Sequence, residues 1–230
     1  STVTAIMNRA DIIDASRIKP GDVIVGLASS GQSTYEDQWN GGMGSNGLTS
    51  ARHDLFNKRV AKLYPESFEP TLTDELAYTG PYFLTDDVSG CPVDAGKMVL
   101  SPTRTYAPIM LPLFKELGQE IHGIIHCSGG GQTKILHFMD KNRVVKDNLF
   151  ETPVLFSEIQ KHSGTNWQEM YQVFNMGHRM EIYLEERYAQ SVIEVSKSFG
   201  VDAQIIGRVE ESEKPELQIK AQNNVYNYTK

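Results

Sequence analysis

Apolar residues occur along this chain in short unbroken runs that alternate with longer segments in which they recur every three or four positions. Unbroken runs are typical of buried strands, and the longer spacing is typical of helices that cover a sheet. Strands interleaved with such helices predict an α+β domain, a layered structure with a mixed sheet and helices on its faces. The strands are expected at residues 2–7, 22–27, 121–127, 180–184, 203–209 and 217–220.

The predicted helices lie between these strands. Ser45 and Asn46 are candidate N-caps for a helix that begins near Leu48. Near the C-terminus, a helix between two strands predicts a ferredoxin-like β-α-β unit over residues 180–209. The helical segments are expected at residues 48–63, 104–117, 132–139, 153–161, 167–174 and 186–199.

Two stretches do not follow this alternation. Residues 64–97 contain four prolines and little periodicity, so we expect an extended or partly helical insertion there. The Asn-rich residues 223–230 are expected to be a dispensable tail. The remaining length is that of one domain with a sizeable core.

Charge and composition narrow the class of ligand. The chain has 22 Lys and Arg against 29 Asp and Glu, a net charge of −7, which argues against a nucleic-acid or anionic membrane surface. Any anionic ligand must therefore be held by a local arrangement of donors. The sequence has no transmembrane run and no charged-then-apolar leader, and Cys91 and Cys127 have no metal-site spacing, so we expect a cytoplasmic protein with reduced thiols and no bound metal.

Two glycine-rich segments follow predicted strands and precede predicted helices. Glycine lets backbone N–H groups approach an anion, serine adds hydroxyl donors, and a following helix presents its positive N-terminus. These segments therefore predict a phosphate cradle, with simple turns as the alternative. The candidate binding residues are Ser29, Ser30, Gly31, Ser45, Asn46 and Gly47 in the first segment and Gly129, Gly130 and Gly131 in the second.

Familiar nucleotide motifs do not account for the first segment. Residues 26–33 have the spacing of a P-loop, but Gln32 stands where the phosphate-binding lysine belongs. Residues 42–47 match G-x-G-x-x-G but lie far beyond the end of their strand, so the tight turn of a dinucleotide-binding fold is missing. We therefore expect neither a Walker site nor a dinucleotide site.

Single residues give weaker signals. Arg104, at the start of a predicted helix, could bind phosphate with its guanidinium, and the alternative is a solvated charge at a helix end. His122 and His126 lie four apart on a predicted strand but have no third ligand nearby in sequence, so they do not predict a metal site. No motif identifies a catalytic residue.

Six segments occur in a characteristic order over residues 5–219. Together they resemble the C-terminal domain of the aminoimidazole ribonucleotide synthetase family, also called phosphoribosylformylglycinamidine cyclo-ligase. The segments are Ala-Asp-Ile-Ile-Asp-Ala-Ser at 10–16, Gly-Asp-Val-Ile-Val-Gly-Leu-Ala-Ser-Ser-Gly at 21–31, Ser-Asn-Gly at 45–47, Leu-Ser-Pro-Thr-Arg-Thr-Tyr at 100–106, His-Cys-Ser-Gly-Gly-Gly at 126–131 and Met-Tyr-Gln-Val-Phe-Asn-Met-Gly at 170–177.

The resemblance implies an ATP- and Mg²⁺-dependent enzyme of purine biosynthesis. Such an enzyme phosphorylates the formyl amide oxygen of formylglycinamidine ribonucleotide, after which the amidine nitrogen closes the imidazole ring and phosphate leaves. It also implies a homodimer built by an N-terminal domain that carries the ATP and metal site. Residues 1–20 would then be the end of that domain or a linker, residues 21–222 the C-terminal domain, and residues 223–230 a tail.

On this reading the chain alone lacks the ATP site and holds no cofactor tightly, and both glycine segments face a substrate cleft between the domains. Two departures from the family pattern are visible. The usual Ser-Ser-Gly-x-His-Ser-Asn-Gly run is interrupted by residues 32–44, with Gly44 at the His position, and residues 57–96 are longer than expected. The alternatives are therefore a non-catalytic scaffold or binding domain, or another ATP-dependent enzyme of the same superfamily, such as selenophosphate synthetase.

Overall fold

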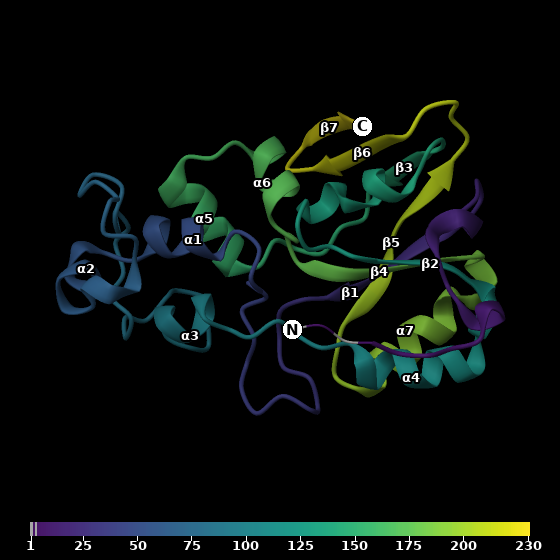
Figure 1. Ribbon diagram of the computed structural model, residues 1–230, viewed down its shortest axis with the longest axis horizontal. Coiled ribbons are helices and arrows are strands. Elements are labelled where there is room, and N and C mark those ends of the chain that lie inside the picture. Colours follow the sequence, from purple (N-terminus) through teal and green to yellow (C-terminus); the bar gives the residue numbers. More distant parts are fainter. Residues whose placement is uncertain (1, 3) are drawn as a thin grey trace.

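A mixed sheet forms the centre of the structure, a computed structural model that describes residue 2 and residues 4–230 (Figure 1). The sheet has seven strands in the order β2-β4-β1-β5-β3-β6-β7, and all neighbours are antiparallel except the parallel pair β3 and β6. The strands are β1 Val23–Ala28, β2 Ile121–His126, β3 Arg143–Lys146, β4 His178–Leu184, β5 Ala203–Glu210, β6 Glu216–Ala221 and β7 Asn224–Thr229.

Helices cover both faces of this sheet. Successive strand side chains point to opposite faces, so Ile24 of β1 joins one hydrophobic core and Val25 joins the other. Helices α4 and α7 lie together on the second face (Figure 1), where Leu113 and Val192 pack. The α-helices are α1 Leu48–Leu55, α2 Lys58–Leu63, α3 Ala95–Val99, α4 Ala107–Glu116, α5 Val154–Ser163, α6 Trp167–Val173 and α7 Ala189–Ser198.

Short 3₁₀ helices complete the chain: η1 Arg9–Asp11, η2 Ala15–Arg17, η3 Pro65–Ser67, η4 Gly118–Glu120, η5 Gly131–Phe138 and η6 Glu186–Tyr188. In the described part of the chain, no helix combines the length and the hydrophobicity that a membrane crossing needs.

The α+β prediction is confirmed. Five of the predicted strands form, as β1, β2, β4, β5 and β6. The chain from β4 through α7 to β5 is the predicted ferredoxin-like unit: β1 lies between β4 and β5 and runs antiparallel to both. The irregular insertion is also found, since residues 64–97 contain only η3 and the start of α3.

Several local predictions are wrong. The strand expected at residues 2–7 is absent from the described residues there, where Ile6 and Met7 are exposed without a neighbouring strand; residue 3 lies outside the described residues. The helix at 48–63 is broken after α1, because Phe56 is extended and pairs with Tyr82. Ser45 and Asn46 do not cap α1; the left-handed Gly47 occupies the N-cap position.

Three further differences concern η5, β3 and β7. The segment after the second glycine turn is the 3₁₀ helix η5, and strand β3 was not predicted at all. Residues 223–230, expected to be a dispensable tail, contain β7, which pairs with β6 along its whole length and forms an edge of the sheet. This segment is therefore an integral part of the sheet.

Shortening Tyr228 to alanine should destabilise the protein, because its ring is buried and its hydroxyl donates to the Gln168 carbonyl at 2.9 Å. We expect Tyr228→Ala to lower the free energy of unfolding by about 3 kcal/mol. Urea unfolding measures this, with the exposed Val225→Ala on the same strand as the control. Equal stability of the two variants would mean that β7 is dispensable after all.

Candidate functional site

The two glycine-rich segments lie against one stretch of chain, residues 174–179, which follows α6. A Cβ on Gly47 would lie 2.3 Å from the Phe174 ring, and a Cβ on Gly131 would lie 2.5 Å from the Phe174 carbonyl oxygen. Both glycines also have positive φ angles, +76° and +50°. Close approach and backbone conformation therefore both require glycine there, and the fold brings together two segments that are far apart in sequence.

Asn175 connects the parts of this site. Its side-chain oxygen accepts a hydrogen bond from the Ser29 hydroxyl at 2.6 Å, and its side-chain nitrogen donates to the Gly42 carbonyl at 2.8 Å. Ser29 is fully buried. The hydroxyl proton of Ser29 is therefore used to hold the loop, and the structure gives this residue a positioning role instead of the ligand contact expected from the sequence.

The other residues of the first segment lie nearer the surface. Gly31 and Asn40 exchange two backbone hydrogen bonds of 2.9 Å, which close residues 32–39 into a loop. Asn46 donates to the Val173 carbonyl, so its amide also holds the segment in place. Ser30 is half-buried and Ser45 is exposed, and both remain at positions that a ligand can reach.

Arg104 does not have the free guanidinium that phosphate binding needs. Its Nε and Nη2 donate to the two carboxylate oxygens of Glu36 at 3.0 and 2.7 Å. Its Nη1 donates to the carbonyls of Ala28 and Ser30, and Nη2 also donates to that of Gly31. With five such bonds the donors are fully used, which corrects the sequence-based interpretation: Arg104 clamps the first glycine segment.

A buried ion pair supports the second segment. The Lys146 ammonium pairs with the Glu181 carboxylate and donates to the backbone and side-chain oxygens of Gln132 at 2.7 and 2.9 Å. Gln132 directly follows Gly131, and its amide nitrogen donates to the Asn175 carbonyl. The pair is therefore linked through Gln132 to the residue that holds the first segment.

The same region contains three side chains with metal-ligand spacing. Donor atoms of Cys127, His178 and Glu181 all lie within 4.8 Å of one another, and all three residues are buried. Burial raises the pKa of the Cys127 thiol well above its usual value, and burial lowers the pKa of His178. Because the Lys146 ammonium already pairs with Glu181, the negative charge of this cluster is balanced by that cation.

His122 has a structural role, because it contacts a buried carboxylate. Its Nδ1 lies 2.9 Å from both carboxylate oxygens of the buried Asp22, so it does not share a site with His126.

Positive charge gathers around the second glycine turn. The Lys134 ammonium lies 4.0 Å from the position of a Cβ on Gly129, and His126 stands exposed at the end of β2. Burial, and then the charges of Arg179 and Lys134, lower the pKa of His126. Like charges that depress a histidine pKa indicate a locally positive potential, which favours an anion.

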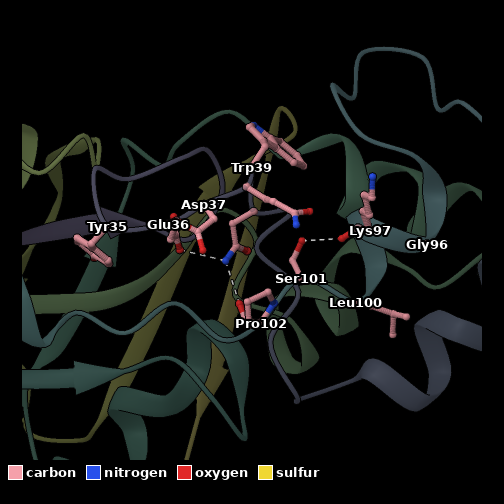
Figure 2. A pocket seen from close by; sticks show the side chains of 11 residues that line it. Tyr35, Glu36, Asp37, Trp39, Gly96, Lys97, Leu100, Ser101 and Pro102 are labelled. Carbon is pink, nitrogen blue, oxygen red and sulfur yellow. Dashed lines mark hydrogen bonds between the residues drawn. The ribbon is translucent and has the colours of Figure 1, made fainter.

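A cavity of about 480 Å³ lies beside the first segment, between residues 35–40 and residues 96–102 (Figure 2). The Asn40 amide nitrogen donates to the Pro102 carbonyl at 2.9 Å, and the Ser101 hydroxyl accepts from the backbone nitrogen of Gly41 at 2.8 Å, so hydrogen bonds join the two stretches. Figure 2 shows Trp39 and Leu100, one from each of the two stretches that line the cavity. The interruption at residues 32–44 therefore packs against the end of the 57–96 insertion and the residues that follow it.

Sequence reasoning missed the residues that organise this site. They are Asn175, Gln132, Lys146, Glu181 and Arg179. A signal existed for three of them, because a charged residue inside an apolar strand, as in Arg-Val-Val-Lys at 143–146 and His-Arg-Met-Glu at 178–181, indicates a buried charge that needs a partner.

Comparison with known proteins identifies relatives over nearly the whole chain. The family described as "AIR synthase related protein, C-terminal domain" matches residues 19–220. The phosphoribosylformylglycinamidine cyclo-ligase of Methanocaldococcus jannaschii is 34% identical over 215 residues, covering 92% of this chain and 51% of that protein. That of Carboxydothermus hydrogenoformans is 32% identical over 215 residues, covering 91% of this chain and 52% of that protein. The chain spans about half the length of these relatives.

Solved structures with similar folds include the hydrogenase maturation protein HypE, with a TM-score of 0.47 and 13% identity over 94% of this chain and 54% of that one. Another is Thermotoga maritima PurL complexed with FGAR, with a TM-score of 0.48 and 12% identity over 96% of this chain and 29% of that one.

Proposed function

Because this chain belongs to the AIR synthase related proteins and forms their C-terminal domain, we propose that it is the C-terminal half of a phosphoribosylformylglycinamidine cyclo-ligase. The complete enzyme uses ATP and Mg²⁺ to close the imidazole ring of formylglycinamidine ribonucleotide and works in the cytoplasm as a homodimer. The family match to residues 19–220 supports a C-terminal domain that begins near residue 21, preceded by the end of an N-terminal domain or a linker at residues 1–20, and strand β7 extends this domain beyond residue 222.

One observation carries this proposal: the two glycine segments converge on residues 174–179 in a region of positive potential. Helix N-termini and glycine turns bind phosphate through backbone N–H groups. Gly129, Gly130 and Gly131, with Lys134 beside them, hold the phosphate of the ribonucleotide, and Ser30 and Ser45 face it from the first segment. This half of the enzyme therefore positions the substrate for ring closure.

The Mg²⁺ site belongs to the other half of the enzyme. Mg²⁺ prefers oxygen ligands in octahedral geometry. The metal-like cluster in the described residues instead offers sulfur, nitrogen and one carboxylate that Lys146 already neutralises. These residues do not fit Mg²⁺, so the chemistry that ATP and Mg²⁺ supply is assigned to the N-terminal domain as partner.

A thermal-shift titration tests the binding role. Formylglycinamidine ribonucleotide at a hundred times its Kd should add about 2.7 kcal/mol to the free energy of unfolding of the chain, because a ligand that binds only the folded state stabilises it. Mg-ATP alone should give no shift. Stabilisation by Mg-ATP would contradict the assignment of the ATP site to the N-terminal half. Absence of any shift with the ribonucleotide would contradict the phosphate-binding role of the two glycine segments.

The catalytic role is tested in the complete enzyme. Turnover of the ribonucleotide to aminoimidazole ribonucleotide is expected, with a lower kcat/KM in the Ser30→Ala, Asn46→Ala double variant. Ser198→Ala, at an exposed position at the end of helix α7, is the control. A complete protein that binds the ribonucleotide without turning it over would be a non-catalytic binding domain instead.

A further inference from the structure

Arg179, on β4, is a buried guanidinium with an unused donor. Its side chain is 2% exposed. Its Nη2 donates to the Gly42 carbonyl, and its Nη1 has no hydrogen-bond partner among the residues that the structure describes. A buried donor without a partner is costly, because it has lost its hydrogen bonds to water.

The charge of Arg179 is also unbalanced. Glu36 pairs with Arg104, and Glu181 pairs with Lys146, so both of these carboxylates already have a cationic partner. Burial lowers the pKa of Arg179, and the nearby charge of Arg104 acts in the same direction. An arginine keeps its proton even so. The protein therefore holds a positive charge in its interior that an anionic ligand would compensate.

The position of this guanidinium places it within the first glycine segment. A Cβ on Gly44 would lie 2.6 Å from Nη2, 2.7 Å from Cζ and 3.0 Å from Nη1. The guanidinium therefore fills the space that a side chain at position 44 would need. Gly44 is buried and Ser45, the next residue, is exposed, so the segment that covers the guanidinium borders the surface.

Arg179 also connects the two glycine segments electrostatically. Its backbone carbonyl accepts a hydrogen bond from the Cys127 nitrogen at 2.7 Å, so Arg179 lies beside the end of β2; after burial, its charge and that of Lys134 lower the pKa of His126 there. A planar guanidinium with N–H donors is well suited to the oxygens of a phosphate. Phosphate is therefore the anion that this combination of charge and donors fits best.

We propose that Nη1 of Arg179 binds a phosphate oxygen of the ligand held between the glycine segments. The inference rests on the proposed function only for the identity of that ligand. The phosphate can be the 5′-phosphate of a ribonucleotide or the inorganic phosphate released by the reaction, and the recognition chemistry is the same.

Titration calorimetry on the chain with inorganic phosphate, ribose 5-phosphate and formylglycinamidine ribonucleotide tests the proposal. Arg179→Met should weaken binding at least about tenfold, the effect of losing a charge-assisted hydrogen bond. Weakening for ribose 5-phosphate and the ribonucleotide assigns Arg179 to the 5′-phosphate, and weakening for inorganic phosphate alone assigns it to the released product. The matched control is Arg208→Met on β5, whose guanidinium is half-exposed and pairs with Asp147.

Thermal unfolding without ligand separates binding from a structural role. Arg179→Met should unfold at the same temperature as the unaltered chain or higher, because it removes an uncompensated buried charge and leaves the Gly42 carbonyl with its bond from Asn175. Unchanged affinity for all three ligands, or no binding of any of them to the unaltered chain, would overturn the proposal.

If Arg179→Met does not fold, Arg179→Lys is measured in its place. It keeps the charge but loses the planar pair of donors, and an intermediate loss of affinity is expected; full affinity would overturn the proposal. Turnover by the complete enzyme is a separate readout. If phosphate binding depends on Arg179 but the complete enzyme shows no turnover, the proposed enzymatic function is wrong and this inference stands. If the complete enzyme shows turnover but the variant binds phosphate as tightly as the unaltered chain, this inference is wrong and the proposed function stands.

Discussion

Replacement of Lys146 by methionine is expected to lower the free energy of unfolding by about 3–5 kcal/mol. The ammonium and the Glu181 carboxylate are both completely buried, and the variant would leave the carboxylate ionised without its cation. The Gln132 carbonyl and amide oxygens would also lose their donor. Urea unfolding gives the magnitude, and a loss below about 1 kcal/mol would show that the pair contributes little to stability.

The double variant Lys146→Met, Glu181→Gln separates the charge from the packing. It removes both charges and should recover part of the lost stability, because no uncompensated ion remains in the interior. The His178 ring nitrogen and the Tyr183 hydroxyl lie 2.9 and 2.7 Å from different oxygens of the carboxylate, so glutamine offers an oxygen acceptor to one of them and an amide donor to the other. A double variant that is as unstable as the sum of the two single variants would contradict this account.

The ion pair between Lys146 and Glu181 also makes the free energy of unfolding depend on pH. Burial alone would raise the pKa of Glu181, but the Lys146 charge and the hydrogen bond with His178 lower it far below its usual range. Because the pKa is lower in the folded state than in the unfolded state, this stabilisation is complete above the unfolded value of about 4.3 and is lost as the pH falls toward the folded value. The double variant should lack this acid-dependent loss.

Replacement of Arg104 by methionine should have a comparable effect, about 4 kcal/mol. The Glu36 carboxylate would lose both of its guanidinium bonds, and the carbonyls of Ala28, Ser30 and Gly31 would lose a donor. Burial tends to raise the pKa of Glu36, and Arg104 outweighs this and lowers it, so the variant should also raise the pH at which Glu36 takes up a proton. Urea unfolding at pH 7, together with unfolding at lower pH, measures both effects.

Arg143→Met is the matched control for Arg104. Arg143 also pairs with one carboxylate, Glu216, at 2.7 Å, but its side chain is 42% exposed. A solvent-exposed pair contributes at most about 1 kcal/mol. The ribonucleotide should stabilise this control as it does the unaltered chain and should stabilise Arg104→Met less, because the first glycine segment has lost its clamp. Equal stabilities of the two variants would mean that the buried bonds of Arg104 do not hold the segment.

Local patterns predict most elements of this fold but not all. The strand at β1 is recognisable because its residues form an apolar run, whereas β3 is not, because Arg143 and Lys146 leave only two apolar residues in a strand of four. The helix expected at residues 48–63 has an unbroken helical pattern. It divides because Phe56 finds a partner in Tyr82, which is a pairing that local spacing does not contain.

In the candidate site, too, the sequence identifies some residues, and only the folded structure explains their roles. The glycines at positions 47 and 131 are visible in the sequence, but the reason for each is Phe174, which contacts both. Arg104 was identified as a candidate phosphate ligand, yet the fold surrounds it with carbonyls and Glu36. The position of Arg179 in an apolar strand indicates a buried charge, but only the folded structure shows that one of its donors is left without a partner among the described residues.

What this sequence determines by itself is the α+β layering, the two glycine segments at the ends of β1 and β2, and the order of motifs that indicates the family. These depend on the spacing of apolar residues and on backbone freedom, which are properties of neighbouring positions. Only the tertiary structure decides which polar groups are satisfied. That depends on contacts between residues far apart in the chain, and so the positioning roles of Arg104 and Lys146 and the free donor of Arg179 become visible only in the folded protein.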